Sequence, residues 1–390
     1  MKQNTYKILT VVGARPQFIK AAPLSKAIAA SENLVEVLVH TGQHYDYELS
    51  QQFFDELGLP TPRYNLEIGS GRHAFQMGQI LIKLDAVLEK EKPDMVVVFG
   101  DTNSTSAAAI TAAKNNIPLA HVEAGLREWN KRIPEEINKL LTDSVTDLYF
   151  CPTPTSVENL KKQGITEGVY LVGDIGIDLI ANNLDRIEKN KAALFDRLNQ
   201  PPAPEGSQAT INYQSPITNH EITEGGYFFM TCHRASNTDD VGKLKQILSI
   251  FDDIKEPIIF PIHPRTRATI EKHGLQHLLE KPHVQVIEPI GFWDTQTLIR
   301  HAKMVLTDSG GVIKEAYFHK VRCCILDNQI EWIEAVNEGW SKITGANRLK
   351  IIDTIKTFEL PTVFSGFLGD GTAAQQIVFI INSYLKKNKK

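Results

Sequence analysis

Short runs of β-branched and other apolar residues alternate with longer amphipathic stretches over most of the 390-residue chain. Alternation of this kind is typical of βαβ units, in which crossover helices join parallel strands. We therefore expect an α/β fold with mostly parallel sheets. The runs expected to form strands are residues 7–12, 35–40, 95–99, 119–122, 148–151, 169–172, 227–231, 257–261, 284–287, 304–307 and 322–326. The helices expected in the first half are residues 16–30, 47–57, 73–90, 102–114 and 134–145.

The length of the chain favours two domains, because a single hydrophobic core rarely keeps growing beyond about 250–300 residues. A Pro-rich run that starts at Pro201, followed by an Asn-, Thr- and Gln-rich stretch, interrupts the alternation. We interpret residues 176–225 as a helix, a linker and an exposed insertion, and we expect the part near 200–225 to be mobile. The expected domains are residues 1–175 and 226–368, and a last helical segment covers residues 369–390.

The composition argues against several classes of protein. A formal net charge of −4 gives no reason to expect nucleic acid or an anionic membrane as a partner. No apolar run approaches the length of a transmembrane helix, and we expect no signal peptide. The four cysteines show neither a CxxC pair nor the spacing of a disulfide framework. We expect a soluble, reduced, cytoplasmic protein that holds any anion through a local site.

Acidic residues follow two neighbouring apolar runs. Asp101 and Glu123 lie where the expected strands 95–99 and 119–122 end. Because open α/β sheets bind ligands at the carboxyl ends of their strands, we expect both acids to face one crevice. A third candidate, Glu135, lies in the first turn of an expected helix, where the helix dipole alone would also explain an acid.

The first expected strand ends in a turn that is typical of an anion site. Gly13 permits a tight turn, Pro16 suits the start of a helix, and the helix N-terminus presents backbone N–H groups to an anion. Arg15 and Lys20 add two cations. The sequence is neither GxGxxG nor a Walker loop, so it does not indicate a dinucleotide. An ordinary strand-to-helix turn with surface cations is the alternative.

A second turn of this type follows the expected strand 304–307. Ser309, Gly310 and Gly311 open a helix, where a diglycine lets backbone amides surround an anion and the Ser309 hydroxyl adds a donor. Glu315 lies about one turn further along, where a carboxylate can accept hydrogen bonds from a ribose diol. Two such sites suggest a nucleoside diphosphate. A solvent-exposed helix acid is the alternative for Glu315.

Histidines and polar residues follow three further strand ends. His233 and Arg234 follow the expected strand 227–231 and are candidate ligand contacts. Gln43, His44 and His263 lie in polar clusters that lack the spacing of a metal site. We interpret these three residues as nucleotide, sugar or effector contacts and expect no metal.

Taken together, these motifs resemble the non-hydrolysing UDP-N-acetylglucosamine 2-epimerase family. The match runs in order along essentially the whole chain, and the combination is highly specific. The motifs are residues 13–20 (GARPQFIK), 100–105 (GDTNST), 121–127 (HVEAGLR), 134–136 (PEE), 231–234 (TCHR), 308–311 (DSGG) and 369–371 (GDG).

The resemblance implies a GT-B-like fold with two Rossmann-like domains and UDP bound in the cleft between them. It also implies a homodimer and a C-terminal helix that packs back on the first domain. The family eliminates UDP to form 2-acetamidoglucal and then adds UDP back with inversion at C2, without a cofactor or a metal. The implied reaction interconverts UDP-GlcNAc and UDP-ManNAc.

The resemblance also implies roles for individual residues. Asp101, Glu123 and Glu135 match the catalytic carboxylates that remove and return the C2 proton, and which acid performs which step stays open. Arg15, Lys20 and His233 would stabilise the diphosphate as leaving group. The residues expected to bind UDP are Arg15, His233, Arg234, Ser309, Gly310, Gly311 and Glu315.

Two positions depart from the family pattern. Many members carry Glu at the position of Ser236 and Arg at the position of Asp327. The loss of that Arg removes a cation near the nucleotide half of the site. These departures bear on the catalytic rate and on the identity of the substrate more than on the fold.

Other motifs leave the substrate open. The Glu331-Trp332 pair, for example, looks more like the branch that includes UDP-2,3-diacetamido-2,3-dideoxyglucuronate 2-epimerases. That substrate carries a C6 carboxylate, which needs another cation, with Arg127, Lys131 and Arg132 as candidates. A GT-B glycosyltransferase, or a UDP-sugar-binding relative without catalysis, is the alternative of another class.

Overall fold

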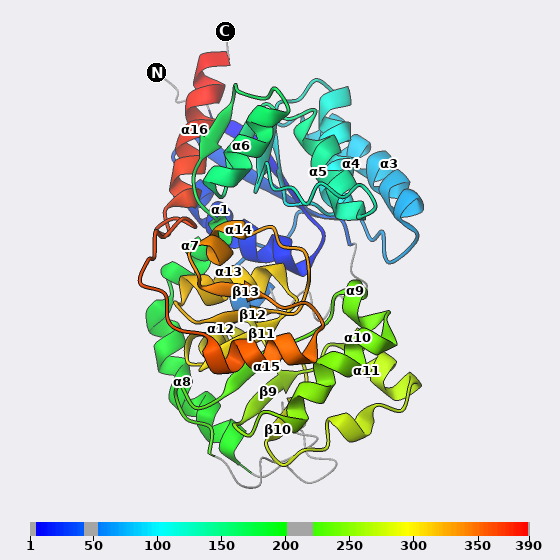
Figure 1. The fold of residues 1–390 in the computed structure, drawn as a ribbon. Helices are drawn as coiled ribbons and strands as arrows, with labels where there is room; N and C mark the ends of the chain where they lie inside the picture. Colours follow the sequence, from blue (N-terminus) through cyan, green and yellow to red (C-terminus); the bar gives the residue numbers. More distant parts are fainter. Residues whose placement is uncertain (1–4, 43–53, 201–220, 389–390) are drawn as a thin grey trace. The chain divides into compact units, whose positions relative to one another are not determined.

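The computed structural model describes residues 5–42, 54–200 and 221–388 (Figure 1). The chain divides into two compact units, each built on one parallel sheet. Unit 1 consists of residues 1–182 and 366–390, and unit 2 consists of residues 183–365. The helix α8 (Leu184–Asn199) belongs to unit 2, because it packs against α12 (Phe292–Arg300).

The sheet of unit 1 has the strand order β3-β2-β1-β4-β5-β6-β7, and every pairing is parallel. Its strands are β1 (Tyr6–Val12), β2 (Leu34–His40), β3 (Tyr64–Asn65), β4 (Met95–Phe99), β5 (Leu119–Val122), β6 (Leu148–Cys151) and β7 (Val169–Leu171). Its helices are α1 (Arg15–Ala29), α3 (His73–Glu91), α4 (Asn103–Lys114), α5 (Pro134–Asp143), α6 (Pro154–Lys162), α7 (Ile175–Ala181) and α16 (Ala373–Asn388).

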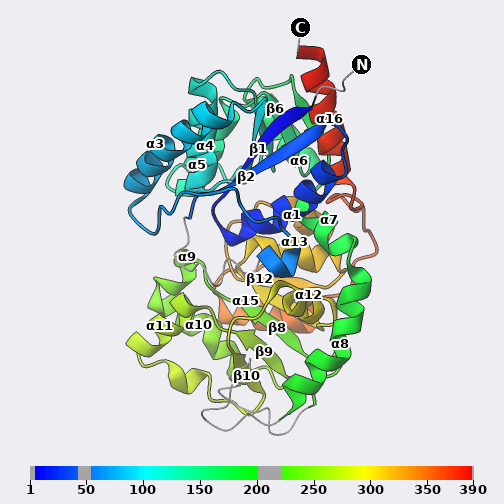
Figure 2. The ribbon, with the colours of Figure 1, turned by 180° about the vertical axis from the view of Figure 1, so that it is seen from behind.

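Small residues let helix α4 lie close to this sheet. Its Ala108, Ala109 and Ala112 pack in one cluster with Leu9 and Val96 of the central strands. The helices α3, α4 and α5 pack in a row, as Figures 1 and 2 show. The close packing of α4 fixes the position of its N-terminal turn, which directly follows the end of β4.

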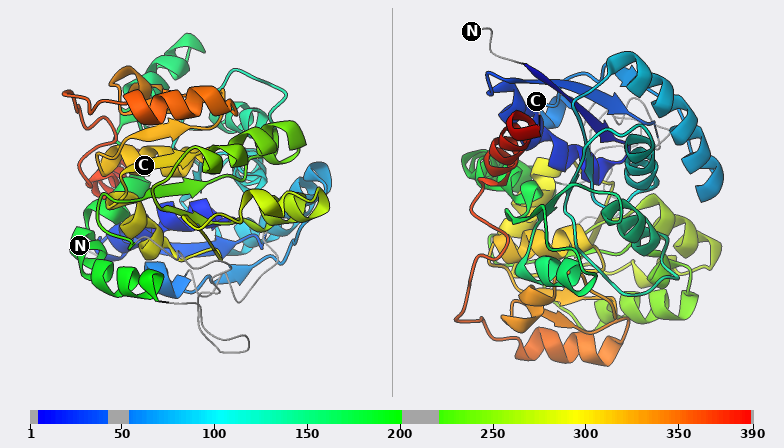
Figure 3. Two further views of the ribbon diagram at one scale, coloured as in Figure 1. Left: turned by 60° about the horizontal axis from the view of Figure 1, so that its bottom comes forward. Right: turned by 90° about the horizontal axis from the view of Figure 1, so that it is seen from above.

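The sheet of unit 2 has the strand order β10-β9-β8-β11-β12-β13 and is also parallel (Figure 3). Its strands are β8 (Phe228–Thr231), β9 (Ile258–Pro261), β10 (Val284–Ile287), β11 (Met304–Thr307), β12 (Cys323–Ile325) and β13 (Ser341–Ile343). Besides α8 and α12, its helical elements are α9 (Ala235–Thr238), α10 (Val241–Leu248), η1 (Ser249–Asp252), α11 (Pro264–Lys272), η2 (Gln276–Leu278), α13 (Gly310–Phe318), α14 (Ile333–Asn337) and α15 (Arg348–Thr357).

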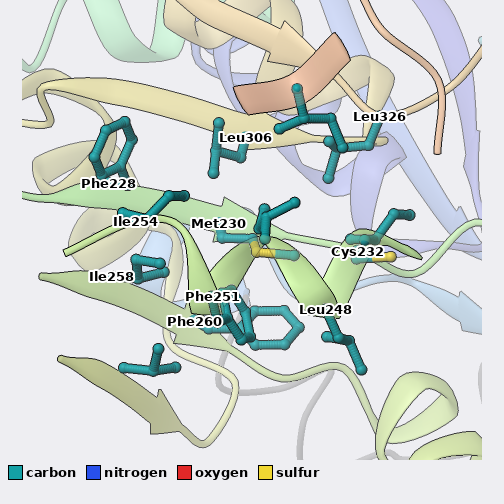
Figure 4. Packing of buried hydrophobic residues seen from close by; sticks show 14 of the residues in the cluster. Phe228, Met230, Cys232, Leu248, Phe251, Ile254, Ile258, Phe260, Leu306 and Leu326 are labelled. Carbon is teal, nitrogen blue, oxygen red and sulfur yellow. The ribbon is translucent and has the colours of Figure 1, made fainter. Parts of the chain in front are cut away.

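A cluster of buried hydrophobic residues in unit 2 lies between its sheet and the helices on one face (Figure 4). Phe228 and Met230 of β8 and Phe260 of β9 meet Leu248 of α10 and Phe251 of η1 in this cluster. The strand residues alternate along β8, as expected when one row of side chains faces each layer of helices. Side chains of β8 and β9 thus anchor the sheet of unit 2 against α10 and η1.

The C-terminal segment closes unit 1. Helix α16 packs against α1 and α7, and Figure 2 shows the three helices together. The Asp178 carboxylate of α7 accepts hydrogen bonds from the N–H groups of Ala373 and Ala374, at 3.2 and 2.7 Å. A Cβ on Gly173 would lie 2.8 Å from the carbonyl oxygen of Leu368, so only glycine permits this crossing of the two segments.

The expected strands agree with the observed strands to within one residue at each end. The sequence patterns missed β3 and β13, because two or three residues at a sheet edge carry too little periodicity, and they also missed α6. Residues 47–53 of the expected helix 47–57, and residues 201–220 of the insertion, lie outside the described residues. Among the described residues, no helix has the length and the apolar character needed to cross a membrane.

Candidate active site

The strand order reverses once in each sheet. In unit 1, β2 and β3 extend the sheet on one side of β1, and β4 to β7 extend it on the other side, so the reversal lies between β1 and β4. In unit 2 the reversal lies between β8 and β11. Ligands of open α/β sheets bind at the carboxyl ends of strands beside such a reversal. The candidate residues follow these strands: Arg15 follows β1, Asp101 follows β4, His233 follows β8, and Ser309 follows β11.

Glu123 has a left-handed backbone conformation, with a φ of 71°. Such a conformation is strained for any residue except glycine, and strained residues concentrate at functional sites. The N–H groups of Glu123 and Ala124 both donate to the carbonyl oxygen of Phe150, at 3.0 and 3.1 Å, and these bonds hold the turn. The Glu123 carboxylate forms an ion pair with Lys20 of α1, and both side chains are largely buried. The strained turn therefore directs this acid toward a lysine.

Lys20 and Glu123 line a small hollow in unit 1. Gly100 lies beside the pair, and a Cβ at this position would be 3.1 Å from both the Glu123 Oε2 and the Lys20 Nζ. The glycine that precedes Asp101 thus leaves the room that the ion pair occupies. The other residues that line the hollow are Pro152, Gly173, Asp174 and Ile175.

Asp101 is held by helix α5. Its carbonyl oxygen accepts a hydrogen bond from the Asn138 side chain at 2.9 Å, and its carboxylate lies 3.5 Å from the Lys139 Nζ. The Asp101 side chain is 33% exposed, whereas that of Lys139 is 3% exposed. Glu135 is exposed in the first turn of the same helix. A lysine therefore lies beside Asp101, as one lies beside Glu123.

Glu136, the neighbour of Glu135, has a structural role. Its side chain is buried, and its carboxylate accepts hydrogen bonds from the N–H groups of Glu128 and Trp129, at 2.9 and 3.2 Å. Trp129 has a φ of 57° and a largely exposed side chain. The buried carboxylate thus holds the loop before α5 in a conformation that tryptophan rarely adopts.

Arg127, predicted as a possible ligand contact, is instead a core residue of unit 1. Its guanidinium donates to the Asp143 carboxylate at 2.5 Å and to the Gln163 side chain at 2.9 Å, and its side chain is fully buried. His121 also contacts Asp143, at 2.6 Å. Burial opposes ionisation of Asp143, but His121 and Arg127 outweigh it and lower the pKa of Asp143. The surroundings of Arg127 do not support a contact with a sugar.

The turn after β1 differs from the anion site that the sequence suggested. The Gln17 Oε1 accepts hydrogen bonds from the N–H groups of Gly13 and Ala14, at 2.7 and 3.1 Å, so these two amides are already bonded. Glycine is needed at position 13 for packing, because a Cβ there would lie 2.2 Å from the Ser104 Oγ and 2.3 Å from the Thr41 Oγ1. The groups at this turn that could still bind an anion are the N-terminus of α1 and the Arg15 side chain.

In unit 2, Asp308 organises the end of β8. Its buried carboxylate accepts hydrogen bonds from the N–H groups of His233 and Arg234 and from the Asn237 side chain, all at 3.0 Å. The His233 side chain is 37% exposed, and its ring centroid lies 5.2 Å from that of His263. The His263 Nδ1 accepts the N–H of Arg265 and so caps α11.

Helix α13 begins at Gly310, within the turn that is predicted to bind an anion. The Ser309 Oγ accepts the N–H of Val312, at 3.5 Å, and caps the helix, so this hydroxyl is an acceptor as well as a possible donor. Gly310 and Gly311 form the first turn. A Cβ on Gly311 would lie 4.0 Å from the Glu315 Oε1, which places this largely buried carboxylate beside the same turn.

The two departures from the family pattern contact each other. The Ser236 hydroxyl donates to the Asp327 carboxylate at 3.1 Å, and the Arg234 guanidinium lies 3.4 Å from the same carboxylate. Asp327 thus adds a negative charge beside Arg234. Ser236 and Arg234 therefore both contact the Asp327 carboxylate.

Two predicted contacts, Gln43 and His44, lie outside the described residues. In the part of the chain that the structure describes, no group of three or more His, Cys, Asp or Glu side chains is arranged to hold a metal.

The profile of the UDP-N-acetylglucosamine 2-epimerase family matches residues 26–382. This chain belongs to that family. A UDP-N-acetylglucosamine 2-epimerase homolog of Methanococcus maripaludis is 44% identical over 97% of this chain and 99% of its own length. The UDP-2,3-diacetamido-2,3-dideoxy-D-glucuronate 2-epimerase of Pseudomonas aeruginosa is 42% identical over 90% of this chain and 92% of its own.

A solved structure extends the similarity to the fold. The crystal structure of the Methanocaldococcus jannaschii UDP-GlcNAc 2-epimerase, in complex with UDP-GlcNAc and UDP, has a TM-score of 0.85 and 36% identity. The match covers 97% of this chain and 99% of that chain. The fold of this chain is GT-B-like, as predicted.

Residues that support the candidate site were missed from the sequence. Gln17 and Asp308 each bond to a segment more than 70 residues away, and Asn138 and its neighbour Lys139 contact Asp101, 37 residues before Asn138. None of them stands at a strand end in a pattern that predicts such a bond, apart from Asp308, which directly follows β11. The sequence therefore offered one signal for these supporting residues: Asp308 is an acid that directly follows a strand beside the reversal of strand order.

Proposed function

We propose that the protein is a non-hydrolysing UDP-N-acetylglucosamine 2-epimerase that interconverts UDP-GlcNAc and UDP-ManNAc. The C2 proton of an N-acetylhexosamine is not adjacent to a carbonyl, so it is too weakly acidic for direct exchange. Elimination avoids this difficulty: a base removes the C2 proton while the bond between C1 and the UDP oxygen breaks, which forms 2-acetamidoglucal and UDP. Protonation of C2 on the other face and return of the UDP oxygen to C1 complete the inversion.

The observation that carries this proposal is the strained Glu123 turn in a member of this family. Its carboxylate, paired with Lys20, lies beside the turn that carries Asp101. Two carboxylates with neighbouring lysines, and Glu135 at the start of α5, provide the groups needed to remove a proton and to return it. Asp101, Glu123 and Glu135 are therefore the proposed proton-transfer residues.

The leaving group needs donors rather than acids. We assign this role to Arg15 and Lys20 in unit 1 and to His233, Arg234 and the start of α13 in unit 2. The helix N-terminus and its first-turn amides favour an anion, and they need no reorganisation as negative charge develops on the departing UDP. Glu315, beside the same turn, is the proposed acceptor for the ribose hydroxyls.

The test is solvent exchange at C2. We expect that incubation with UDP-GlcNAc in deuterated water yields recovered UDP-GlcNAc and UDP-ManNAc that both carry deuterium at C2, measured by NMR and mass spectrometry. A glycosyltransferase or a non-catalytic relative would bind UDP without incorporating deuterium. Binding of UDP without C2 exchange would therefore refute the epimerase.

A second substrate has a specific observation in its favour. The P. aeruginosa diacetamido-glucuronate epimerase is 42% identical to this chain. Arg127 already forms an ion pair with Asp143. The C6 carboxylate of such a substrate would therefore depend on Lys131 or Arg132, which are exposed in the loop before α5. The same exchange experiment with the diacetamido uronate compares the two substrates directly, through their kcat/KM values.

We also propose a compartment, an oligomeric state and a biosynthetic role for this enzyme. We propose a cytoplasmic homodimer that supplies UDP-sugars for polysaccharide biosynthesis, as the family resemblance suggests. Light scattering coupled to gel filtration tests the dimer, since a mass near that of one chain would contradict it.

A further inference from the structure

Trp332, which precedes helix α14, has a buried donor without an acceptor. Its side chain is 2% exposed, and its Nε1 has no hydrogen-bond partner among the described residues. Buried indole N–H groups usually find a partner, because an unpaired buried donor is unfavourable. In the same unit, the Trp340 Nε1 donates to the carbonyl oxygen of Val363 at 2.7 Å. The unpaired Nε1 of Trp332 therefore requires an explanation.

The Trp332 Nε1 lies close to the start of α13. A Cβ added to Gly310 would lie 3.6 Å from the Trp332 Nε1, 3.6 Å from the Arg234 Nη2 and 3.8 Å from the Glu331 Oε2. These three polar atoms surround one point on the first turn of the helix. Because Gly310 has no side chain at that point, a ligand atom placed there would lie within reach of the indole and guanidinium donors and beside the Glu331 carboxylate.

A lysine strengthens the donor. The Lys314 Nζ lies 4.9 Å from the centroid of the Trp332 ring, and Lys314 is also largely buried. A cation over the ring withdraws electron density from the indole, and the low dielectric of a buried site strengthens this polarisation. The N–H of Trp332 is thus more positive than that of an isolated indole, which favours an anionic acceptor.

We propose that the Trp332 N–H donates a hydrogen bond to an anionic oxygen of the UDP diphosphate held at the start of α13. The inference rests on the proposed function, because that function places a diphosphate at this turn. It adds a side-chain donor to the backbone amides of Gly310 and Gly311. A ring that only packs against Lys314 would have no need of its N–H group.

The first test is Trp332→Phe, which removes the donor and keeps an aromatic ring beneath Lys314. We expect the dissociation constant for UDP, measured by calorimetry, to rise roughly tenfold or more, as for loss of a hydrogen bond to a charged group. The melting temperature without UDP should change little, because the N–H has no partner among the described residues. In the matched control, Trp340→Phe, the protein loses a hydrogen bond to Val363 but should bind UDP as the wild type does.

The second measurement follows the indole protons directly. The chain has four tryptophans, so ¹⁵N-tryptophan labelling gives at most four indole N–H signals, and the Trp332→Phe spectrum identifies the signal of Trp332. We expect this signal to move downfield when UDP is added, while the signal of Trp340 stays in place. A merely structural role would leave the Trp332 signal unchanged.

Gly310→Ala keeps the proposal falsifiable if Trp332→Phe fails to fold. The added methyl makes only ordinary contacts, at 3.6 Å or more, so the variant should fold, but the methyl fills the space in front of the indole. We expect it to lose UDP affinity and the shift of the Trp332 signal. Equal UDP affinity of the wild type and Trp332→Phe, or an unmoved Trp332 signal in the UDP complex, would overturn the inference. Failure of the proposed function would appear separately, as UDP binding without C2 exchange by the wild type.

Discussion

At the scale of single residues, backbone geometry distinguishes Glu123 from the other acids. A left-handed conformation costs a glutamate about 1–3 kcal/mol, which the surrounding structure must supply. Two hydrogen bonds to Phe150 and the ion pair with Lys20 supply it here. Strain retained in this way is expected when the direction of a side chain matters more than stability.

The first prediction concerns the proton-transfer acids. Glu123→Gln and Asp101→Asn preserve shape but remove the base, so C2 deuterium exchange should fall at least about 100-fold. The UDP dissociation constant should stay within about twofold of the wild-type value, because the proposed UDP contacts do not include these acids. Asp85→Asn, at an exposed position of α3, is the control and should exchange normally. Full exchange by Glu123→Gln would remove this residue from the mechanism.

The second prediction compares two glycines of unit 1. Gly13→Ala places a Cβ 2.2 Å from the Ser104 Oγ, so we expect a loss of about 1–3 kcal/mol in the free energy of unfolding. Gly78→Ala, on helix α3, meets nothing within 4 Å and should gain about 0.5–1 kcal/mol. Urea denaturation measures both. If Gly13→Ala proved as stable as the wild type, the tight packing assigned to Gly13 would be wrong.

At the scale of elements, helix α5 serves the candidate site along its whole length. Glu135 is exposed in its first turn, Glu136 holds the preceding loop, and Asn138 and Lys139 hold Asp101. Asp143 at its end pairs with His121 and Arg127. Its register relative to β4 and β5 therefore sets the positions of the proposed acids.

The third prediction concerns the contact between α7 and α16. Burial raises the pKa of Asp178 to about 6, although the N–H groups of Ala373 and Ala374 oppose the shift. Because the unfolded chain ionises this acid at a lower pH than the folded chain, stability should fall as the pH rises from about 4 through 6, by about 3 kcal/mol. Asp178→Asn cannot titrate, so its melting temperature relative to the wild type should rise by several degrees between pH 5 and pH 7.5.

The control for this titration is Asp85→Asn. Its melting temperature relative to the wild type should be the same at both pH values, since the exposed side chain is not held by α16. A difference between Asp178→Asn and the wild type that does not depend on pH would mean that Asp178 ionises normally in the folded protein.

At the scale of the whole molecule, each unit carries its own strand reversal and its own set of candidate residues. In unit 1 these residues are mainly acids with neighbouring lysines, and in unit 2 they are a helix N-terminus with His233 and Arg234. We assign proton transfer at C2 to the first set and departure of UDP from C1 to the second set.

The fourth prediction tests this division of roles by hydrogen–deuterium exchange of the backbone. UDP should slow amide exchange at residues 309–315, where α13 begins, and should leave α3 of unit 1 unchanged. The Asp101→Asn variant should show the same protection while it fails to exchange the substrate at C2. UDP binding without protection at 309–315 would place the nucleotide elsewhere.

The sequence alone was enough to predict the described strands apart from the short β3 and β13, as well as the parallel sheets and the acids at the strand ends. These features depend on local patterns: apolar runs predict buried strands, and the carboxyl ends of parallel strands share one edge of a sheet. The motifs along the chain also predicted the family, which the comparisons confirm. Local patterns cannot predict which distant side chains will pair.

Only the tertiary structure decided the roles of several residues within those patterns. Arg127 and Gly13 belong to candidate motifs, but Arg127 is buried against Asp143, and the absence of a side chain at Gly13 makes room for Ser104 and Thr41. The Nε1 of Trp332 lies close to α13 because the chain between them returns through β12, which no periodicity shows. Such contacts join segments far apart in sequence, and packing and burial alone determine whether a charged or polar side chain meets a ligand or another residue.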